Sequence, residues 1–423
     1  MSKKTLMERC KANTNIDADT FVGINAAHGE ITVNFPLGFG LSQNEKELRR
    51  EILLLLNVLA KNTEKKESEV NTKQNDNCVN LPIQAYLYII ADYYSRGYYK
   101  ETESDYFVSK RGKVNWGKTV KTQRAFIQDE DIYYLDFVTK KNNVNENEII
   151  TLIHEACVYE SFKKIGWLFT AFMPPKPRIN IRNRRKYCMA IVKKRIADTF
   201  NDRNRQLLKN VLAVVASLGD EGSANEFRYG TYRFEYIWES MIDKAYGINS
   251  KEKYFPKTRW VLPEKEHENA ALEPDTIMMR GDTVYVLDAK YYKYGWSGVE
   301  GHLPESTSIN KQITYGEYIA ESEEFRKINN IDNNPVVYNA FIMPYDSYGK
   351  TFHTEKELHY IGSAISDWKS SDGTRPYEDV VGILLDVKSL MENHSHSEDR
   401  IINLASLIEE SVEKNRRRFI DKR

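Results

Sequence analysis

The stretch EPDTIMMRGDTVYVLDAK, residues 273–290, decides the fold of this chain. Gly281-Asp282 is a two-residue turn signal of the Gly-X type, and the flanking runs Thr276–Met279 and Thr283–Leu287 are rich in residues that favour strands. The stretch therefore predicts a β-hairpin. With its turn at residues 281 and 282, cross-strand partners have residue numbers that sum to 563.

This register places Asp275 opposite Asp288, because 275 and 288 also sum to 563. Directly opposed residues have Cβ atoms ~5 Å apart, and like charges so placed destabilise a sheet unless something neutralises them. A divalent cation would do so. Lys290 lies two residues beyond Asp288, so strand alternation puts its ammonium group on the same face.

These three side chains suit the hydrolysis of a phosphodiester bond. Carboxylates hold a hard ion such as Mg²⁺ or Mn²⁺, which polarises a phosphoryl oxygen and acidifies a water molecule. Lys290 can orient that water or stabilise the charge that develops on the phosphorane. In the alternative interpretation Asp288 caps a strand end and Lys290 only reaches solvent. The register match and the upstream Pro274-Asp275 pair favour the metal site.

Further carboxylates lie close to the hairpin in sequence. Residues 234–245 (FEYIWESMIDKA) have apolar positions at helical spacing, and Glu235 and Glu239 share one edge of that predicted helix. Either one is a candidate for a further metal ligand. Glu273 and Glu239 are candidate substitute carboxylates. A core helix with two surface glutamates is the alternative interpretation.

Candidate phosphate contacts occur in two segments. A helix predicted to begin near Asn310 carries Gln312 and Tyr315 on adjacent positions of one face. Residues 176–209 are dense in Lys and Arg, and among them Arg184 and Arg185 are candidate contacts. A charge run of this kind is also typical of a solvated helix face, and the sequence leaves both interpretations open.

Composition places the chain among globular proteins. It has 423 residues, which favours more than one core, and 41% hydrophobic residues with 27 tyrosines. Its 61 basic and 61 acidic residues give no net charge, so affinity for nucleic acid must come from local patches. No apolar run is long enough for a membrane span, and we expect a cytoplasmic protein.

Cysteines and histidines indicate no other chemistry. The four cysteines lie far apart without a CxxC pair, which argues against a disulfide framework and a zinc knuckle, and we expect reduced thiols: Cys10, Cys78, Cys157 and Cys188. The eight histidines form no HxxxH or HExxH pattern. Neither a zinc enzyme nor a serine or cysteine nucleophile is indicated.

The remaining patterns divide the chain into parts. They predict helices at 44–62, 81–94, 146–169 and 186–216 and a strand at 131–138. The Pro-rich break at 173–177 and the polar spacer at 219–225 are predicted boundaries. We therefore expect an N-terminal domain at 1–172, a basic helical connector at 173–225, a nuclease domain at 226–393 and a C-terminal helix with a basic tail at 394–423.

The order of elements predicts an α/β fold for the second domain. From residue 226 onward it is expected to run helix, hairpin, helix, strand, helix, strand, which is typical of a mixed sheet flanked by helices. The first domain is expected to be mainly helical with some strand, an α+β arrangement.

At these residues the chain resembles the PD-(D/E)xK nuclease superfamily. In that pattern a helix with a Glu precedes a hairpin with Pro-Asp and then Asp/Glu-x-Lys, and a later helix carries a Gln-x-x-x-Tyr-like element. Asp288 takes the acid position before Lys290 here, and the spacing from Gln312 to Tyr315 is one residue short, with Tyr318 nearby.

A narrower resemblance covers residues 36–392. The segments that carry it resemble the LlaJI-type restriction endonucleases, which are similar to McrC: PLGFGL (36–41), DYYSRGYYKE (92–101), GKVNWGKTV (112–120), FEYIWESM (234–241) and VVGILLDVKSLM (380–391). The resemblance implies a nuclease subunit that cleaves double-stranded DNA together with an McrB-like AAA+ GTPase. It implies that the N-terminal half docks on this partner, and that Glu235, in Phe234-Glu235, is the better ligand candidate.

One motif competes with this interpretation. Gly112–Thr119 (GKVNWGKT) fits the P-loop pattern GxxxxGK[ST], which by itself would indicate an NTPase. A phosphate-binding loop needs a buried strand before it and compact residues within it, whereas the preceding run is short and polar and Trp116 is bulky. The family segment explains the match better.

Three functions remain open from the sequence. The first is the restriction nuclease subunit that works with a GTPase. The second is a DNA repair or recombination nuclease that acts alone. The third is a non-catalytic subunit that activates a partner NTPase.

Overall fold

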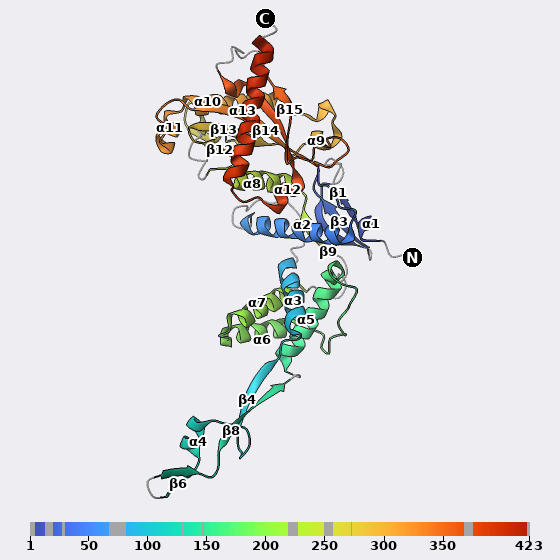
Figure 1. The fold of residues 1–423 in the computed structure, drawn as a ribbon, viewed down its shortest axis with the longest axis vertical. Coiled ribbons are helices and arrows are strands. Elements are labelled where there is room, and N and C mark those ends of the chain that lie inside the picture. The colour runs from blue at the N-terminus through green and yellow to red at the C-terminus, as the bar shows by residue number, and fades with distance from the viewer. Residues whose placement is uncertain are drawn as a thin grey trace. The chain divides into compact units, whose positions relative to one another are not determined.

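The computed structural model describes residues 5–12, 20–27, 30–66, 82–128, 131–145, 148–218, 227–248, 257–271, 273–367 and 375–420. The chain divides into two compact units. We call residues 1–80 with 226–423 the sheet unit, and residues 81–225 the arm unit. Both units mix helices and strands (Figure 1), so the expected α/β character is confirmed.

A five-stranded mixed sheet forms the centre of the sheet unit. Its order is β12-β13-β14-β16-β15, where the strands are β12 (Thr276–Arg280), β13 (Thr283–Ala289), β14 (Val336–Tyr345), β15 (Leu358–Ala364) and β16 (Val380–Asp386). β13, β14 and β16 are parallel, and the edge strands β12 and β15 are antiparallel to their neighbours. All seven residues of β16 are buried, as expected for a parallel strand covered on both faces.

The predicted hairpin register is confirmed. β12 and β13 pair from Thr276 with Leu287 to Arg280 with Thr283, so each pair sums to 563. Gly281, the first turn residue, has φ +58°, a conformation that glycine adopts without steric cost.

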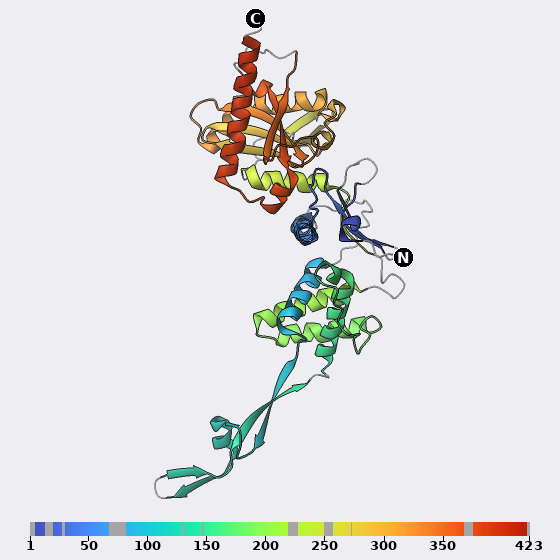
Figure 2. The same ribbon diagram turned by 45° about the vertical axis from the view of Figure 1, so that its right-hand side comes forward.

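Helices cover both faces of this sheet. α10 (Ser306–Glu321) packs on one face, and α13 (Glu398–Ile420) runs across the other (Figure 2). α10 approaches β14 closely at Gly316, where an added Cβ would lie 2.6 Å from the side-chain nitrogen of Asn339. On the opposite face, the hydroxyl of Tyr285 donates a hydrogen bond to Glu409 of α13.

Shorter elements complete the sheet unit. They are α8 (Phe234–Tyr246), β10 (Lys257–Val261), β11 (Glu266–Ala271), α9 (Tyr294–Ser297), η4 (Glu300–His302), α11 (Glu323–Asn329), η5 (Pro376–Glu378) and α12 (Val387–Glu392). The prediction of a helix between the last two strands of the domain was wrong. β15 occupies that place and extends the sheet, because its backbone pairs with β16 along Leu358–Ala364.

The N-terminal segment belongs to the sheet unit. It contributes α1 (Leu6–Arg9), β1 (Cys10–Ala12), β2 (Val22–Ala27), β3 (Glu30–Phe35) and α2 (Glu45–Lys66). β2 pairs with β9 (Phe227–Thr231) from Val22 with Thr231 to Ala26 with Phe227, in a sheet of order β1-β3-β2-β9. Glu51 of α2 also forms a 2.5 Å ion pair with Lys388 of α12.

The observed division corrects the expected domain boundaries. The expected boundary between residues 225 and 226 coincides with the edge of the arm unit. The expected N-terminal domain at 1–172 is split instead, and residues 173–225 form part of the arm unit rather than a separate connector. The physical reason is the pairing of β2 with β9, which joins segments about two hundred residues apart in sequence.

The arm unit combines a helical body with an extended arm. The body contains α3 (Ile83–Arg96), α5 (Ile149–Ile165), η1 (Gly166–Leu168), α6 (Arg185–Asp198) and α7 (Asp202–Ser217). The arm contains β4 (Glu101–Val108), β5 (Lys113–Val114), α4 (Trp116–Thr122), β6 (Ala125–Gln128), β7 (Asp131–Tyr134) and β8 (Val138–Asn145), and the ribbon in Figure 1 shows β4 and β8 leading from the helices to the β6–β7 hairpin.

Two predicted elements of this unit differ from the structure. The helix expected at 186–216 is two helices, because Asn201 caps the start of α7 with a hydrogen bond from the backbone N–H of Asn204 to its side chain. The single strand expected at 131–138 is divided between two strands, because β7 ends at Tyr134 and β8 begins at Val138. Helices at 83–96 and 149–165 match the expected ones within a few residues.

The P-loop-like segment folds without a phosphate-binding loop. Its Gly117 lies in the first turn of α4, whose N-cap is Asn115, and only the two-residue β5 precedes it. The Thr119 hydroxyl accepts a hydrogen bond from the backbone N–H of Val138 at 2.9 Å, so this side chain holds α4 against β8. The alternative NTPase interpretation has no structural support in this segment.

Two findings concern thiols and membranes. Cys10, Cys157 and Cys188 are free thiols, and Cys78 lies outside the described residues. In the part of the chain that the structure describes, no helix is both long and apolar enough to span a bilayer.

A buried histidine makes the arm unit sensitive to acid. His154 of α5 is 1% exposed, and its Nδ1 accepts a hydrogen bond from the backbone N–H of Tyr99 at 2.9 Å. Within the described residues its Nε2 has no hydrogen-bond partner. Burial is the main cause that lowers the pKa of His154 to about 4.

We expect the free energy of unfolding of this unit to fall as the pH falls from 6.5 towards 4. The unfolded chain takes up a proton on His154 in this range and the folded chain does not, which costs about 2 kcal/mol at pH 5 relative to pH 8. His154→Gln should remove this part of the pH dependence, whereas the exposed His353→Gln should leave it unchanged. Urea denaturation followed by pulsed hydrogen exchange in α5 measures it, and an unchanged slope in His154→Gln contradicts the assignment.

Candidate active site

Three side chains meet at the open end of the β12–β13 hairpin. Asp288 is the penultimate residue of β13 and is 8% exposed. Asp275 immediately precedes β12, and its Oδ2 accepts a hydrogen bond from the backbone N–H of Ala289 at 2.8 Å. The backbone of the facing strand therefore holds Asp275 opposite Asp288, as the register predicted.

The surroundings of Asp275 strongly perturb its carboxyl group. Burial raises the pKa of Asp275 well above its usual range, and both a hydrogen bond with Asp288 and the negative charge of Asp288 raise it further. The Ala289 N–H acts in the opposite direction because it stabilises the ionised form. Two carboxylates in such contact cannot both be ionised at low cost without a positive charge beside them.

Lys290 supplies one positive charge. Its Nζ lies 2.6 Å from Oδ2 of Asp288, and its side chain is 18% exposed. The backbone N–H of Lys290 donates to the carbonyl of Ile342 at 2.9 Å, which continues the pairing of β13 with β14. Lys290 thus faces the aspartates from a fixed backbone position, and its single charge leaves the second carboxylate uncompensated.

The donor set fits a hydrated divalent cation. Among the residues that the structure describes, no group of three or more His, Cys, Asp or Glu side chains is placed to hold a metal ion. Mg²⁺ usually binds proteins through one or two carboxylates and keeps several of its water molecules. The paired oxygens of Asp275 and Asp288 match that requirement, because they are hard donors whose like charges need compensation.

The three candidate glutamates, Glu235, Glu239 and Glu273, have different surroundings. The charge of Glu239, on α8, contributes to the raised pKa of Asp275, so Glu239 lies on the side of the aspartates. Glu235 instead contributes to the raised pKa of Tyr291. Glu273 is exposed, and its backbone carbonyl accepts a hydrogen bond from Tyr315. The charge interaction with Asp275 favours Glu239 over Glu235 as a further carboxylate, and the metal-binding role of each stays a prediction.

Gln312 and Tyr315 hold α10 against the hairpin. Gln312 has no exposed surface, and its side-chain amide donates to the carbonyl of Val286 in β13 at 2.7 Å. Tyr315 is 2% exposed, and its hydroxyl donates to the Glu273 carbonyl at 2.9 Å. Both side chains are thus engaged with the backbone around the aspartates, and contact with substrate phosphate stays a prediction for them.

The basic segment of the arm unit is partly neutralised by acids of α5 and its N-cap. Ion pairs of 2.5–2.8 Å join Arg178 to Glu155, Arg182 to Glu160 and Arg195 to Glu148. Arg184 is exposed, and Arg185, also exposed, donates a hydrogen bond to the Ala216 carbonyl. Several arginines of this segment therefore form ion pairs within the helical body. Phosphate contact by Arg184 and Arg185 stays a prediction.

Sequence analysis missed the contacts that hold the chain in place next to Lys290. Tyr291, the next residue, is half-buried, and its hydroxyl accepts a hydrogen bond from the backbone N–H of Leu37 at 2.6 Å. Leu37 belongs to PLGFGL, where Gly38 has φ +76° and lies so close to Tyr345 that an added Cβ would be 3.0 Å from its backbone. The N-terminal segment thus fixes the chain immediately after Lys290, and only the quoted PLGFGL motif signalled it.

Comparisons with known proteins found a matching family and a similar protein. A family model described as LlaJI restriction endonuclease matches residues 21–388. The component YdjA of the type II restriction enzyme BsuMI from Bacillus subtilis (strain 168) is 24% identical over 277 residues, which cover 60% of this chain and 56% of that protein. The chain thus spans little more than half the length of this relative.

One solved structure is also similar. It is a half-complex from the tetradecameric assembly of Thermococcus gammatolerans McrB AAA+ hexamers with bound McrC. The match has a TM-score of 0.40 and 16% sequence identity, and it covers 92% of this chain and 83% of the other.

The charge arrangement predicts that Mg²⁺ stabilises the folded protein. Binding to the paired aspartates should raise the free energy of unfolding by roughly 3 kcal/mol when the ion is at about a hundred times its dissociation constant. Asp288→Asn should abolish this gain. The same substitution at Asp282, an exposed residue of the hairpin turn, should preserve it. Chemical denaturation with and without Mg²⁺ measures the effect, and equal stabilisation of both variants contradicts the site.

Proposed function

Because this chain belongs to the LlaJI restriction endonuclease family, we propose that it is the McrC-like nuclease subunit of a restriction system and hydrolyses DNA phosphodiester bonds at Asp275, Asp288 and Lys290. The observation that carries the proposal is the contact of a half-buried and a buried carboxyl group with each other and of an ammonium group with one of them, 2.6 Å away. Perturbed groups of this kind cluster at catalytic sites.

We assign the sheet unit to the PD-(D/E)xK fold. The support is a mixed sheet with helices on both faces, in which an antiparallel hairpin carries Pro274-Asp275 on one strand and Asp288-x-Lys290 at the end of the next. α8 precedes the hairpin with Glu239 on the side of the aspartates, and α10 follows it.

The residues of the site divide the chemistry between them. A bound Mg²⁺ or Mn²⁺ would supply Lewis acidity towards a phosphoryl oxygen and lower the pKa of a water molecule. Asp275 and Asp288 would hold the ion, with Ala289 N–H fixing the orientation of Asp275. Lys290 would place its ammonium group beside the phosphate and stabilise negative charge as it develops there.

The proposed substrate is double-stranded DNA, and the proposed partner is an McrB-like AAA+ GTPase. The sequence resemblance to McrC supports the partner, and the Bacillus subtilis relative is named as one component of a restriction enzyme. Sequence recognition would then belong at least in part to the partner, because contacts with phosphate position an enzyme on DNA without selecting a base sequence.

The arm offers a surface for docking this partner. Residues 116–135 of the arm include seven large apolar side chains that are each at least 46% exposed: Trp116, Val120, Phe126, Ile127, Ile132, Tyr133 and Leu135. Clustered exposed apolar residues mark interaction sites in proteins that stay soluble. They form around a two-stranded hairpin and a seven-residue helix, which have little core of their own to bury them.

Plasmid cleavage tests the catalytic assignment. We expect the wild-type chain to cut DNA with Mg²⁺, GTP and the GTPase partner, and we expect Asp288→Ala and Lys290→Ala to lose on the order of a hundredfold or more in rate, because each removes a charge from the reacting centre. Purified proteins are compared by the rate of conversion of supercoiled plasmid.

Two exposed positions of the same unit provide matched controls. Asp282→Ala and Lys350→Ala should cut at the wild-type rate, since both residues are exposed. Cutting by Asp288→Ala at the wild-type rate would overturn the assignment. Cutting by the wild type without any partner would support a nuclease that acts alone instead.

The docking surface is tested by partner binding. Ile127→Ser combined with Ile132→Ser should weaken co-elution with the GTPase at least tenfold, because the double substitution removes two apolar side chains that are 76% and 63% exposed. Phe200→Ser, at a 93% exposed residue between α6 and α7, is the matched control and should bind normally. Unchanged binding by the double variant would remove the arm from the interface.

A further inference from the structure

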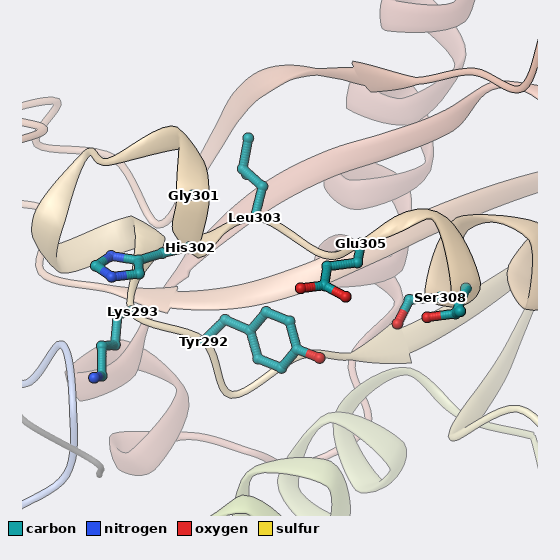
Figure 3. Close-up of a pocket in the computed structure, with 8 residues that line it drawn as sticks. Tyr292, Lys293, Gly301, His302, Leu303, Glu305 and Ser308 are labelled. Atoms are coloured by element: carbon teal, nitrogen blue, oxygen red, sulfur yellow. The ribbon is translucent and has the colours of Figure 1, made fainter. Parts of the chain in front are cut away.

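A cavity lies beside the candidate active site. Its volume is about 340 Å³, and it is bounded by the loop that follows Lys290 and by the start of α10. The lining side chains include Tyr292, Lys293, His302, Glu305, Thr307 and Ser308. Figure 3 shows the Tyr292 ring lying next to the Glu305 carboxylate, with Ser308 towards its hydroxyl end and His302 and Lys293 on the other side.

The chain topology places this cavity at the catalytic edge of the sheet. β13 and β14 are parallel, and α10 connects them, so α10 begins near the carboxyl end of β13 where Asp288 and Lys290 lie. Tyr292 follows Lys290 by two residues, and its backbone N–H donates to the Lys290 carbonyl at 2.8 Å. Ligands of open α/β sheets bind in the crevice at the carboxyl ends of the strands.

Several polar groups of the cavity are available to a ligand. Across the described ranges, the hydroxyl groups of Tyr292, Thr307 and Ser308 and the carboxylate of Glu305 make no hydrogen bond to another protein group. Glu305 is the N-cap residue of α10, yet its side chain makes no capping hydrogen bond. Glu305 and Ser308 lie beside the ring of Tyr292 (Figure 3), so the cavity combines hydrogen-bonding groups with a flat apolar face.

The wall of the cavity is held in place by packing behind it. His302 is fixed by a 2.7 Å hydrogen bond between its Nδ1 and the hydroxyl of Ser297. Leu303 packs against the core cluster under α10. The free polar groups are therefore presented from a supported loop.

We propose that this cavity binds one nucleotide of the DNA substrate next to the cleaved phosphodiester. The base stacks on Tyr292, and its exocyclic amino group donates to Glu305. Base–aromatic stacking is tolerant of sequence, and a carboxylate favours bases that present an amino group. The inference rests on the proposed nuclease function and adds a subsite that selects the flanking base.

The cavity chemistry favours a base over a second phosphate group. Glu305 contributes a negative charge close to the ring of Tyr292, and this charge would repel a phosphate placed there. An aromatic face does not attract a phosphate group, whereas it stacks on any nucleobase.

Fluorescence quenching tests nucleotide binding without cleavage. The full chain carrying Asp288→Asn is titrated with a single-stranded oligonucleotide that contains 2-aminopurine, whose emission falls on stacking. Quenching is expected, and adding Tyr292→Ala should weaken binding roughly tenfold and remove the quenching. The exposed Tyr348→Ala is the matched control and should quench normally. Equal quenching by the Tyr292→Ala protein overturns the proposal.

Sequencing of cleavage ends tests base selection. Wild type and Glu305→Gln each cut, with Mg²⁺, GTP and the partner, a pool of duplexes whose bases are randomised. Wild type should disfavour thymine, the one base without an exocyclic amino group, at one position beside the cut, and Glu305→Gln should reduce that bias several-fold. Glu300→Gln, an exposed residue of the same loop outside the cavity lining, should retain it.

The two assays separate the subsite from the nuclease function. Quenching that depends on Tyr292, together with no cutting by wild type, keeps the nucleotide site and rejects the proposed function. The opposite outcome rejects the subsite and keeps the nuclease function. In that case wild type cuts, Glu305→Gln gives the same distribution of cleavage ends, and Tyr292→Ala does not change the quenching.

Discussion

The opposition of Asp275 and Asp288 is the constraint on which the site depends. Like charges in contact are unfavourable, and this protein holds the two carboxyl groups together through the strand register and the 2.8 Å hydrogen bond from Ala289 N–H to Asp275. Lys290 compensates one carboxylate at 2.6 Å and leaves the other. The arrangement is therefore stable only at a cost that a bound cation would offset, which is the usual relation between strain and function at catalytic sites.

The surrounding elements keep this unfavourable pair from separating. α10 is joined to the hairpin by Gln312, which donates to Val286, and by Tyr315, which donates to Glu273. On the other side, Leu37 donates to Tyr291 and so fixes the chain just beyond Lys290. These contacts come from segments far apart in sequence, and the same supported loop then forms the wall of the cavity at Tyr292 and Glu305.

The two units have different kinds of surface. In the sheet unit most apolar residues of β13, β14 and β16 are buried beneath helices. In the arm unit the apolar side chains around Ile127 and Ile132 stay exposed. This contrast is consistent with the proposed roles of the two units, catalysis in the sheet unit and partner docking by the arm.

The sequence by itself determined the hairpin, its register and the meeting of Asp275, Asp288 and Lys290, because the glycine turn and strand alternation are local rules that reach only across neighbouring residues. It also determined most helices, through apolar spacing. Only the tertiary structure decided that residues 1–80 join the second half through β2 and β9, that β15 is a strand, and that the charge of Glu239 acts on Asp275. Long-range strand pairing and the rotation of a helix about its axis depend on packing between distant segments, which no local pattern encodes.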